Sequence, residues 1–162
     1  MILIALGSNQ RGPWGSPAEA VAKALIQLDR DGMHLMAASR LLVSAPFGKT
    51  NQPPFVNAVA RIATHLPPGA LLQKLHAIER AAGRRRLLRW GPRSLDLDLL
   101  DYHGMVSGKP SRLALPHPGI AERIFVLKPI AEIAPRWKHP LRHASAAMLL
   151  RRLDRHGEGA EI

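Results

Sequence analysis

The apolar residues of this chain repeat with two different periods, and the order of those periods most constrains its fold. Residues 2–6 are apolar without a break, and leucines alternate with aspartates over residues 95–99, as in β-strands. Over residues 55–64, apolar residues occupy every second position, at Val56, Ala58, Ala60 and Ile62. Residues 35–44 are also predicted to form a strand. Two segments, after Ser16 and after Pro67, repeat their apolar residues with the period of a helix.

The predicted order is therefore β-α-β-β-α-β, which is typical of a ferredoxin-like α+β sandwich with an antiparallel sheet covered by helices. Ser16 and Glu19 form the pattern of a capping box at the start of the first helix, and Gly83 is a natural stop for the second. We expect a C-terminal extension with short elements near 112–115 and 124–133 and a helix near 144–153. The chain of 162 residues is predicted to be one catalytic domain, 1–162.

Composition and charge narrow the classes of partner. The absence of cysteine excludes disulfides and thiolate metal sites and favours a reducing compartment, so we expect a cytoplasmic protein. The apolar start is too short for a signal peptide or a membrane span. A net charge of +11 points to nucleic acid, an acidic membrane or a phosphorylated small molecule. Aromatic residues make up only 4%, which argues against a stacking platform for single-stranded nucleic acid.

The segment 84–98 combines two kinds of charged group. Five arginines and Trp90 precede Asp96 and Asp98, which the period of two places on one side of a strand, roughly 7 Å apart. Guanidinium groups bind phosphate oxygens and paired carboxylates bind Mg2+, so the segment predicts a site for a polyphosphate nucleotide with its metal. The alternative is a basic loop neutralised by nearby acids. We expect residues 84–93 to be disordered or open without nucleotide and to close over it. We expect Asp101 to lie on the leucine face, outside the site.

Other candidates carry weaker signals. Phe55 and Asn57 share one strand face, where they could stack on a heterocycle and read its edge, or simply pack within the sheet. His117 lies between two prolines in a rigid turn and could donate to a phosphate, although a lone histidine is usually structural. His76 and Glu79 share one helix face, as a surface pair or as nucleotide contacts. Gly7-Ser8-Asn9 is predicted to form a tight turn after the first strand.

Taken together, these segments resemble the 6-hydroxymethyl-7,8-dihydropterin pyrophosphokinase family of folate biosynthesis. The resemblance covers nearly the whole chain in the same order, and the family fold is ferredoxin-like. The matching segments are Ala5-Leu6-Gly7-Ser8-Asn9, Phe55-Val56-Asn57-Ala58, Gly83-Arg84-Arg85-Arg86, Arg89-Trp90-Gly91-Pro92-Arg93-Ser94-Leu95-Asp96-Leu97-Asp98-Leu99-Leu100, and Pro116-His117 with Arg123 and Phe125.

The resemblance implies transfer of pyrophosphate from ATP to the pterin hydroxymethyl group, with release of AMP. It implies two Mg2+ ions on Asp96 and Asp98, and catalytic roles for these two residues together with Arg84 and Arg93. The implied nucleotide contacts are His76, Glu79, Arg84, Arg86, Trp90, Arg93, Leu99, Arg112, His117 and Arg123. The implied pterin contacts are Ser44, Pro46, Phe47, Phe55, Asn57, Trp90, Asp96 and Phe125.

We therefore expect a monomer that acts on two small molecules, ATP and hydroxymethyldihydropterin, without a nucleic-acid or membrane partner. A basic ferredoxin-like nucleic-acid-binding module is the alternative from another class. That module would bind in a strongly salt-dependent manner, and the chain lacks the Lys/Arg-Gly-aromatic motif of such sheets. A non-catalytic relative is a third possibility, against which the intact Arg93, Asp96 and Asp98 argue.

Overall fold

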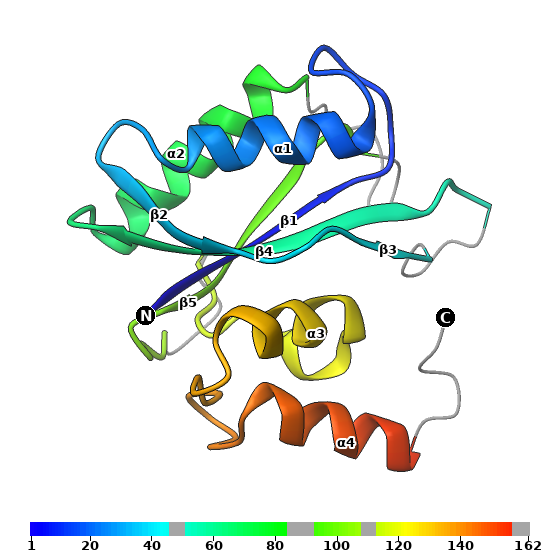
Figure 1. The fold of residues 1–162 in the computed structure, drawn as a ribbon. Helices are drawn as coiled ribbons and strands as arrows, with labels where there is room; N and C mark the ends of the chain where they lie inside the picture. Colours follow the sequence, from blue (N-terminus) through cyan, green and yellow to red (C-terminus); the bar gives the residue numbers. More distant parts are fainter. Residues whose placement is uncertain (46–50, 84–92, 108–112, 157–162) are drawn as a thin grey trace.

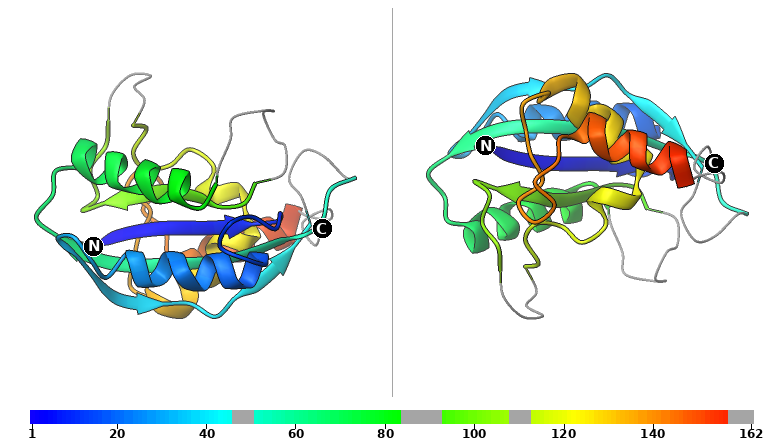
Figure 2. Two further views of the ribbon diagram at one scale, coloured as in Figure 1. Left: turned by 90° about the horizontal axis from the view of Figure 1, so that it is seen from above. Right: turned by 90° about the horizontal axis from the view of Figure 1, so that it is seen from below.

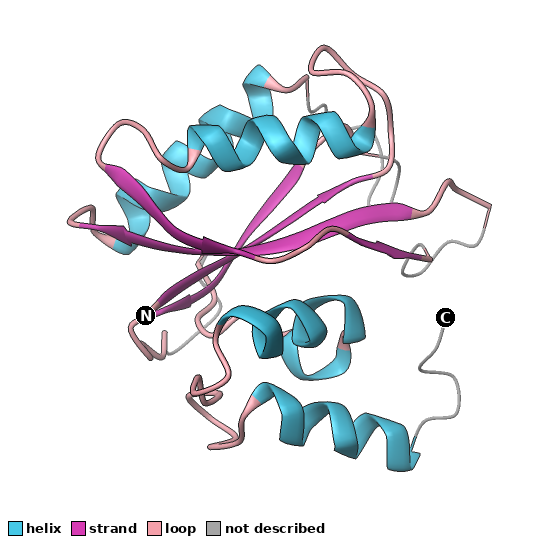
Figure 3. Ribbon diagram, viewed as in Figure 1, coloured by secondary structure: helices cyan, strands magenta, loops and turns pink. Residues whose placement is uncertain are grey.

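A central antiparallel sheet with helices on both faces forms the protein, as seen in a computed structural model that describes residues 1–45, 51–83, 93–107 and 113–156 (Figures 1 and 3). The elements are β1 (Ile2–Ser8), α1 (Pro17–Gln27), β2 (Met33–Ala38), β3 (Leu42–Ser44), β4 (Phe55–Thr64), α2 (Pro68–Ala81), β5 (Asp96–Tyr102), the short 3-10 helix η1 (Ile120–Glu122), α3 (Ile124–Ile133) and α4 (Ala146–His156). The predicted α+β class and β-α-β-β-α-β order are confirmed, with β2 and β3 together in the place of the second strand.

The sheet has the strand order β2-β4-β1-β5, and β3 pairs with β4. Every pairing is antiparallel, and β1 lies between β4 and β5. The first and last strands of the β-α-β-β-α-β unit are therefore neighbours, although some 90 residues separate them in the chain. This juxtaposition brings the aspartates of β5 beside β1.

The single strand predicted over 35–44 is divided in two. The pairing of β2 with β4 shifts register between Leu35 and Ala37, which is the mark of a β-bulge. The Ser39 amide donates to the Val59 carbonyl, and the Ser39 hydroxyl accepts from the Val59 amide, each at 2.9 Å. A side chain thus replaces one backbone partner of β4, and regular pairing resumes only at Leu42.

Two apolar cores lie on opposite faces of the sheet. Helices α1 and α2 cover one face of the sheet and α3 covers the other, with α4 packed against α3 (Figure 2). Ile4 and Leu6 of β1 belong to the core beneath α1 and α2, whereas Leu3 belongs to the core that includes residues of α3 and α4. This follows from the alternation of side chains along a strand. The C-terminal extension is therefore a full layer, with Leu127 of α3 and Leu149 of α4 in its core.

The helix boundaries follow the chemistry of their ends. The Ser16 hydroxyl accepts from the Glu19 amide at 3.3 Å, and the Glu19 carboxylate accepts from the Ser16 amide at 3.0 Å, so the predicted capping box is confirmed. Gly83 follows α2 with φ of 90°, a conformation that glycine adopts at little cost. Residues 113–115 form no helix or strand. No helix in the described part of the chain combines the length and the apolar character required to cross a bilayer.

Candidate functional site

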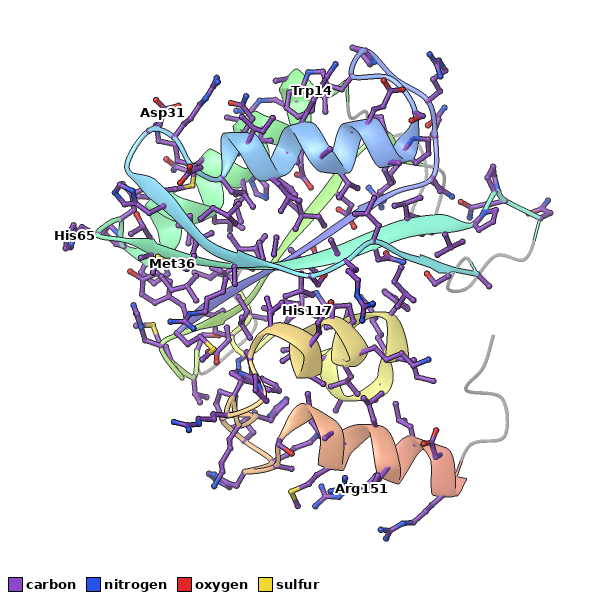
Figure 4. All side chains as sticks on the ribbon, viewed as in Figure 1. Trp14, Asp31, Met36, His65, His117 and Arg151 are labelled. Atoms are coloured by element: carbon purple, nitrogen blue, oxygen red, sulfur yellow. The ribbon has the colours of Figure 1, made fainter. Side chains whose placement is uncertain are left out.

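A cavity of about 290 Å³ lies between the sheet and the layer that contains α3. Strands β1, β3, β4 and β5 supply its floor, and the turn before η1 together with the start of α3 supplies its roof. Figure 4 shows His117 between the sheet and α3, where these two surfaces meet. Polar side chains from the floor and the roof therefore face one another across one cavity.

The floor is built around a row of residues that runs across three strands. Gly7 of β1 pairs with Asp96 of β5 on one side and with Asn57 of β4 on the other. A methyl group on Gly7 would come within 3.2 Å of the Asn57 Oδ1 atom and 3.6 Å of the Phe55 ring. The lack of a side chain at Gly7 leaves the space between the carboxylate and the amide open.

Asn57 is held in one orientation by β3. Its side chain is largely buried, and its Nδ2 atom donates to the Ser44 hydroxyl at 2.5 Å and to the Leu42 carbonyl at 3.4 Å. Its Oδ1 atom consequently faces Gly7 and the cavity. Phe55, two residues earlier on the same strand, also lines the cavity. The expected pairing of a ring and an amide on one strand face is therefore present.

Asp96 and Asp98 both line the cavity, as the alternation along β5 predicted. The described residues contain no cluster of three or more side chains able to hold a metal ion. Two carboxylates alone nevertheless suit Mg2+, which keeps several water or phosphate oxygens among its ligands. The donor set therefore fits an ion that arrives with a polyphosphate.

His117 and Arg123 supply the polar groups of the roof. The His117 Nδ1 atom accepts from the Gly119 amide at 3.0 Å, so the proton of the neutral ring lies on Nε2, 3.9 Å from the Asp98 Oδ2 atom. The pKa of His117 is lowered from 6.5 to about 4, chiefly by burial and also by the charge of Arg123, while the charge of Asp96 opposes this shift. At neutral pH the ring is uncharged, so it forms no ion pair with Asp98.

Arg123 and Phe125 both line the cavity, and the Arg123 guanidinium carbon lies 6.0 Å from the centre of the Phe125 ring. This distance is at the limit for a cation–π contact. The roof thus offers a cation beside an aromatic ring, opposite the carboxylates of the floor.

Arg93 enters the cavity from a backbone that Asn9 anchors. The Arg93 amide donates to the Asn9 Oδ1 atom at 2.8 Å, and the Asn9 amide donates to the Arg93 carbonyl at 3.0 Å. The Asn9 Nδ2 atom also donates to Gln52 Oε1 and to the Pro53 carbonyl, each at 3.0 Å. A single buried side chain thereby joins the segments before β4 and before β5.

Sequence reasoning assigned Asn9 to a turn and missed this role. The predicted turn at Gly7-Ser8-Asn9 is wrong at its start, because β1 continues through Ser8. Ser8 is fully buried, and its hydroxyl donates to the Ser94 carbonyl at 2.7 Å. Two consecutive polar residues at the end of an apolar strand were the available signal, but their partners lie between 43 and 86 residues away in the chain.

The predicted site residues fall into three groups. The structure gathers nine of them around the cavity: Ser44, Phe55, Asn57, Arg93, Asp96, Asp98, His117, Arg123 and Phe125. His76, Glu79 and Leu99 are not among the described residues that line it. Pro46, Phe47, Arg84, Arg86, Trp90 and Arg112 lie outside the described residues, as does most of the segment 84–93 that we expect to close over nucleotide.

Glu79 has a structural task in this arrangement. It is only 3% exposed, and its Oε2 atom accepts from the Leu97 amide at 2.8 Å. Leu97 separates the two aspartates on the edge strand β5, so Glu79 fixes the backbone from which both carboxylates project. Leu99 packs in the core beneath α1 and α2, on the opposite face of the sheet from the cavity.

Asp101 lies on a different face from the one predicted. The register of β1 and β5 shifts so that Leu3 pairs with Asp101 and Ile4 with Leu99, which leaves Leu100 as an extra residue. The Asp101 carboxylate accordingly points toward the α3–α4 layer, where it accepts from Trp137 Nε1 at 2.7 Å and from the Gly104 amide at 2.9 Å. The expectation of the leucine face was wrong, but Asp101 is not among the residues lining the cavity.

The fold and the cavity define an α+β protein whose site suits a phosphorylated ligand and a flat heterocycle. The family model for 7,8-dihydro-6-hydroxymethylpterin-pyrophosphokinase (HPPK) matches residues 3–135. The chain therefore belongs to the HPPK family.

Similar proteins agree with this assignment. The chain is 44% identical over 140 residues to a 2-amino-4-hydroxy-6-hydroxymethyldihydropteridine pyrophosphokinase of Pseudomonas aeruginosa, covering 86% of this chain and 83% of the relative. It is 45% identical over 131 residues to the enzyme of that name from Haemophilus influenzae, covering 81% and 79%. A crystal structure of a Plasmodium falciparum HPPK-DHPS triple mutant aligns with a TM-score of 0.74 at 14% identity, over 99% of this chain and 46% of that chain, and supports the fold alone.

Proposed function

We propose that this protein transfers pyrophosphate from ATP to the hydroxymethyl group of 6-hydroxymethyl-7,8-dihydropterin, a step of folate biosynthesis that releases AMP. Membership of the HPPK family and relatives named as pyrophosphokinases support this reaction. The observation that carries the proposal is one cavity lined by Asp96, Asp98, Arg93 and Arg123 together with two phenylalanines and a fixed amide. The carboxylates and guanidinium groups suit the phosphates of ATP with their metal, and the two phenylalanines with the amide suit the pterin ring.

Asp96 and Asp98 would hold two Mg2+ ions together with the phosphates of ATP. When bound, the metal would neutralise charge on the phosphates and polarise the phosphoryl group. The two carboxylates come from one rigid strand whose backbone is fixed by Glu79 at Leu97. Such a support holds both groups in a constant relation to each other.

The pterin would lie between Phe55 and Phe125, with Asn57 at its polar edge. The Asn57 amide is oriented before binding, because its donor atom is already engaged by β3 and its acceptor atom faces the cavity. A preoriented acceptor selects a ligand with a donor at that position. Asp96, Ser44, Pro46, Phe47 and Trp90 would complete this subsite.

Cationic and neutral donors would hold the nucleotide. Arg93 and Arg123 line the cavity and would bind phosphate oxygens, and the neutral His117 would donate its Nε2 proton without adding charge. Arg84, Arg86, Trp90, Arg112, His76, Glu79 and Leu99 remain proposed contacts from the family resemblance. We propose that residues 84–93 close over the bound nucleotide.

In the reaction, the pterin hydroxyl oxygen would form a bond to the β-phosphorus of ATP, and the bond from that phosphorus to the bridging oxygen of AMP would break. The hydroxyl proton would be lost to solvent. Positioning and charge neutralisation dominate such transfers, since the protein has little covalent chemistry to perform. The catalytic roles of Arg84, Arg93, Asp96 and Asp98 are of this kind.

The nucleic-acid-binding alternative is less well supported. Modules of that type use a bare sheet face for single-stranded RNA. In this protein α1 and α2 cover one face and α3, backed by α4, covers the other, within the described part of the chain (Figure 3).

The proposal is tested by the release of AMP from ATP in the presence of the pterin substrate and Mg2+. We expect wild-type turnover, and a loss of about 100-fold or more in Asp98→Ala, as for removal of one group that stabilises a transition state. Asp154→Ala, an exposed position on α4, is the matched control and should retain activity. Undiminished turnover in Asp98→Ala would overturn the metal assignment, and no AMP release by the wild type would overturn the proposed reaction.

A further inference from the structure

Gly119 lies in the turn between His117 and η1, and its missing side chain leaves room for a guanidinium group. A methyl group placed on Gly119 would lie 2.7 Å from Arg123 Nε, 2.8 Å from Cζ and 3.1 Å from Nη2. Three atoms of one planar group at such similar distances mean that the guanidinium lies face-on against the glycine. Backbone conformation does not require a glycine at this position, because its φ is −89°.

We propose that Gly119 is a positioning residue, whose bare backbone forms the seat that holds the Arg123 guanidinium in the cavity for binding an anionic ligand. Both residues line the cavity, and Arg123 is its only cationic side chain from the roof among the described residues. The identity of the anion as the ATP phosphates rests on the proposed function. The seat itself is a property of the free protein.

A side chain at position 119 would displace the guanidinium rather than the backbone. The turn is held by hydrogen bonds from the Gly119 amide to His117 Nδ1 and from the Arg123 amide to the Ile120 carbonyl, and Ile120 is fully buried. The arginine side chain, in contrast, has several rotatable bonds and a partly exposed position. The strain of an added methyl group is therefore relieved by movement of the Arg123 guanidinium and not of the backbone of the turn.

The test is a double-mutant cycle that combines Gly119→Ala with Arg123→Gln. Binding of a nonhydrolysable ATP analogue with Mg2+ is measured by calorimetry, and KM for ATP and kcat are measured by AMP release. We expect Gly119→Ala to weaken analogue binding about tenfold, as for the loss of most of one charge-assisted contact. KM should rise to a similar extent, and kcat should change less than about twofold.

In the Arg123→Gln background, Gly119→Ala should weaken binding less than about twofold, because the group that it displaces is gone. Gly69→Ala on α2, where an added methyl group meets no atom within 4 Å, is the matched control and should leave binding unchanged. Equal losses in both backgrounds, or no loss with Arg123 present, would overturn the proposal.

A second measurement needs no ligand and therefore separates this proposal from the proposed function. The Arg123 Nε–H signal is followed by NMR in the free protein. We expect Gly119→Ala to shift it and Gly69→Ala to leave it in place, while both variants unfold at denaturant midpoints close to that of the wild type. An unchanged signal in Gly119→Ala would refute the seat, whatever the protein's reaction proves to be.

Discussion

Replacement of Asn9 by alanine tests how firmly the two segments beside the cavity are joined. Its side chain accepts one hydrogen bond from the Arg93 amide and donates two, to Gln52 and to the Pro53 carbonyl. The residue is only 2% exposed, so water cannot replace these partners without rearrangement. The change therefore removes the partner of two groups in partly buried hydrogen bonds, the Arg93 amide and the Pro53 carbonyl.

The expected loss follows from the number of bonds. At about 1 kcal/mol for each of three hydrogen bonds, Asn9→Ala should lower the free energy of unfolding by about 3 kcal/mol. For a chain of this size that corresponds to a fall in Tm of roughly 6–12 °C. Because the Arg93 backbone loses one of its two hydrogen bonds to Asn9, kcat/KM for AMP release should fall as well.

Urea denaturation of wild type, Asn9→Ala and Gln52→Ala measures the first effect. Gln52→Ala removes only one of the three partners and should cost about 1 kcal/mol. If Asn9→Ala proves no more destabilising than Gln52→Ala, the bonds to Arg93 and Pro53 contribute nothing, and the reasoning fails.

Two further outcomes follow from buried polar groups. Glu79→Ala should destabilise the fold by about 1–3 kcal/mol in denaturant titrations, because the Leu97 amide loses its acceptor; Glu79→Gln, which keeps an acceptor oxygen, should cost less, and equal losses would contradict the assigned bond. In the metal-free protein the folded-state pKa of His117 lies at about 4, below its ordinary value of 6.5, so the unfolded chain binds the proton first as pH falls. The contribution of His117 to the free energy of unfolding should therefore be fully present above pH 6.5 and decline toward pH 4, by up to about 3 kcal/mol. His117→Gln should flatten this pH dependence in unfolding curves recorded between those pH values. An unaltered slope would show that His117 is not the titrating group.

Local signals predicted the elements that depend on local interactions. The alternation over residues 55–64 and the capping box at Ser16 correspond to β4 and to the start of α1 as observed. Where the sequence prediction was wrong, long-range contacts decide the structure. The bulge opposite Leu3 turns Asp101 to the other face of the sheet, and the Ser39 hydroxyl interrupts the strand expected over 35–44.

The same distinction holds for the cavity. The alternation along β5 was enough to place Asp96 and Asp98 together, because both lie on one strand. The seat at Gly119 depends on how a side chain four residues later folds back over the turn, and a glycine in a sequence gives no sign of what lies against it. The anchor at Asn9 depends on segments that meet only in the folded chain.

The two separate cores have a consequence for how ligands influence the molecule. One core lies between the sheet and the helices α1 and α2, the other lies between the sheet and the layer of α3 and α4, and the cavity lies at the boundary of the second. If the C-terminal layer detaches in a subglobal opening, the roof is lost while the first core persists. A ligand at 100 times its Kd would oppose that opening by about 2.7 kcal/mol. Amide hydrogen exchange in α3 and α4 would therefore slow much more than in α1. Exchange in these two helices would thus report occupancy of the cavity, although most of their residues do not line it.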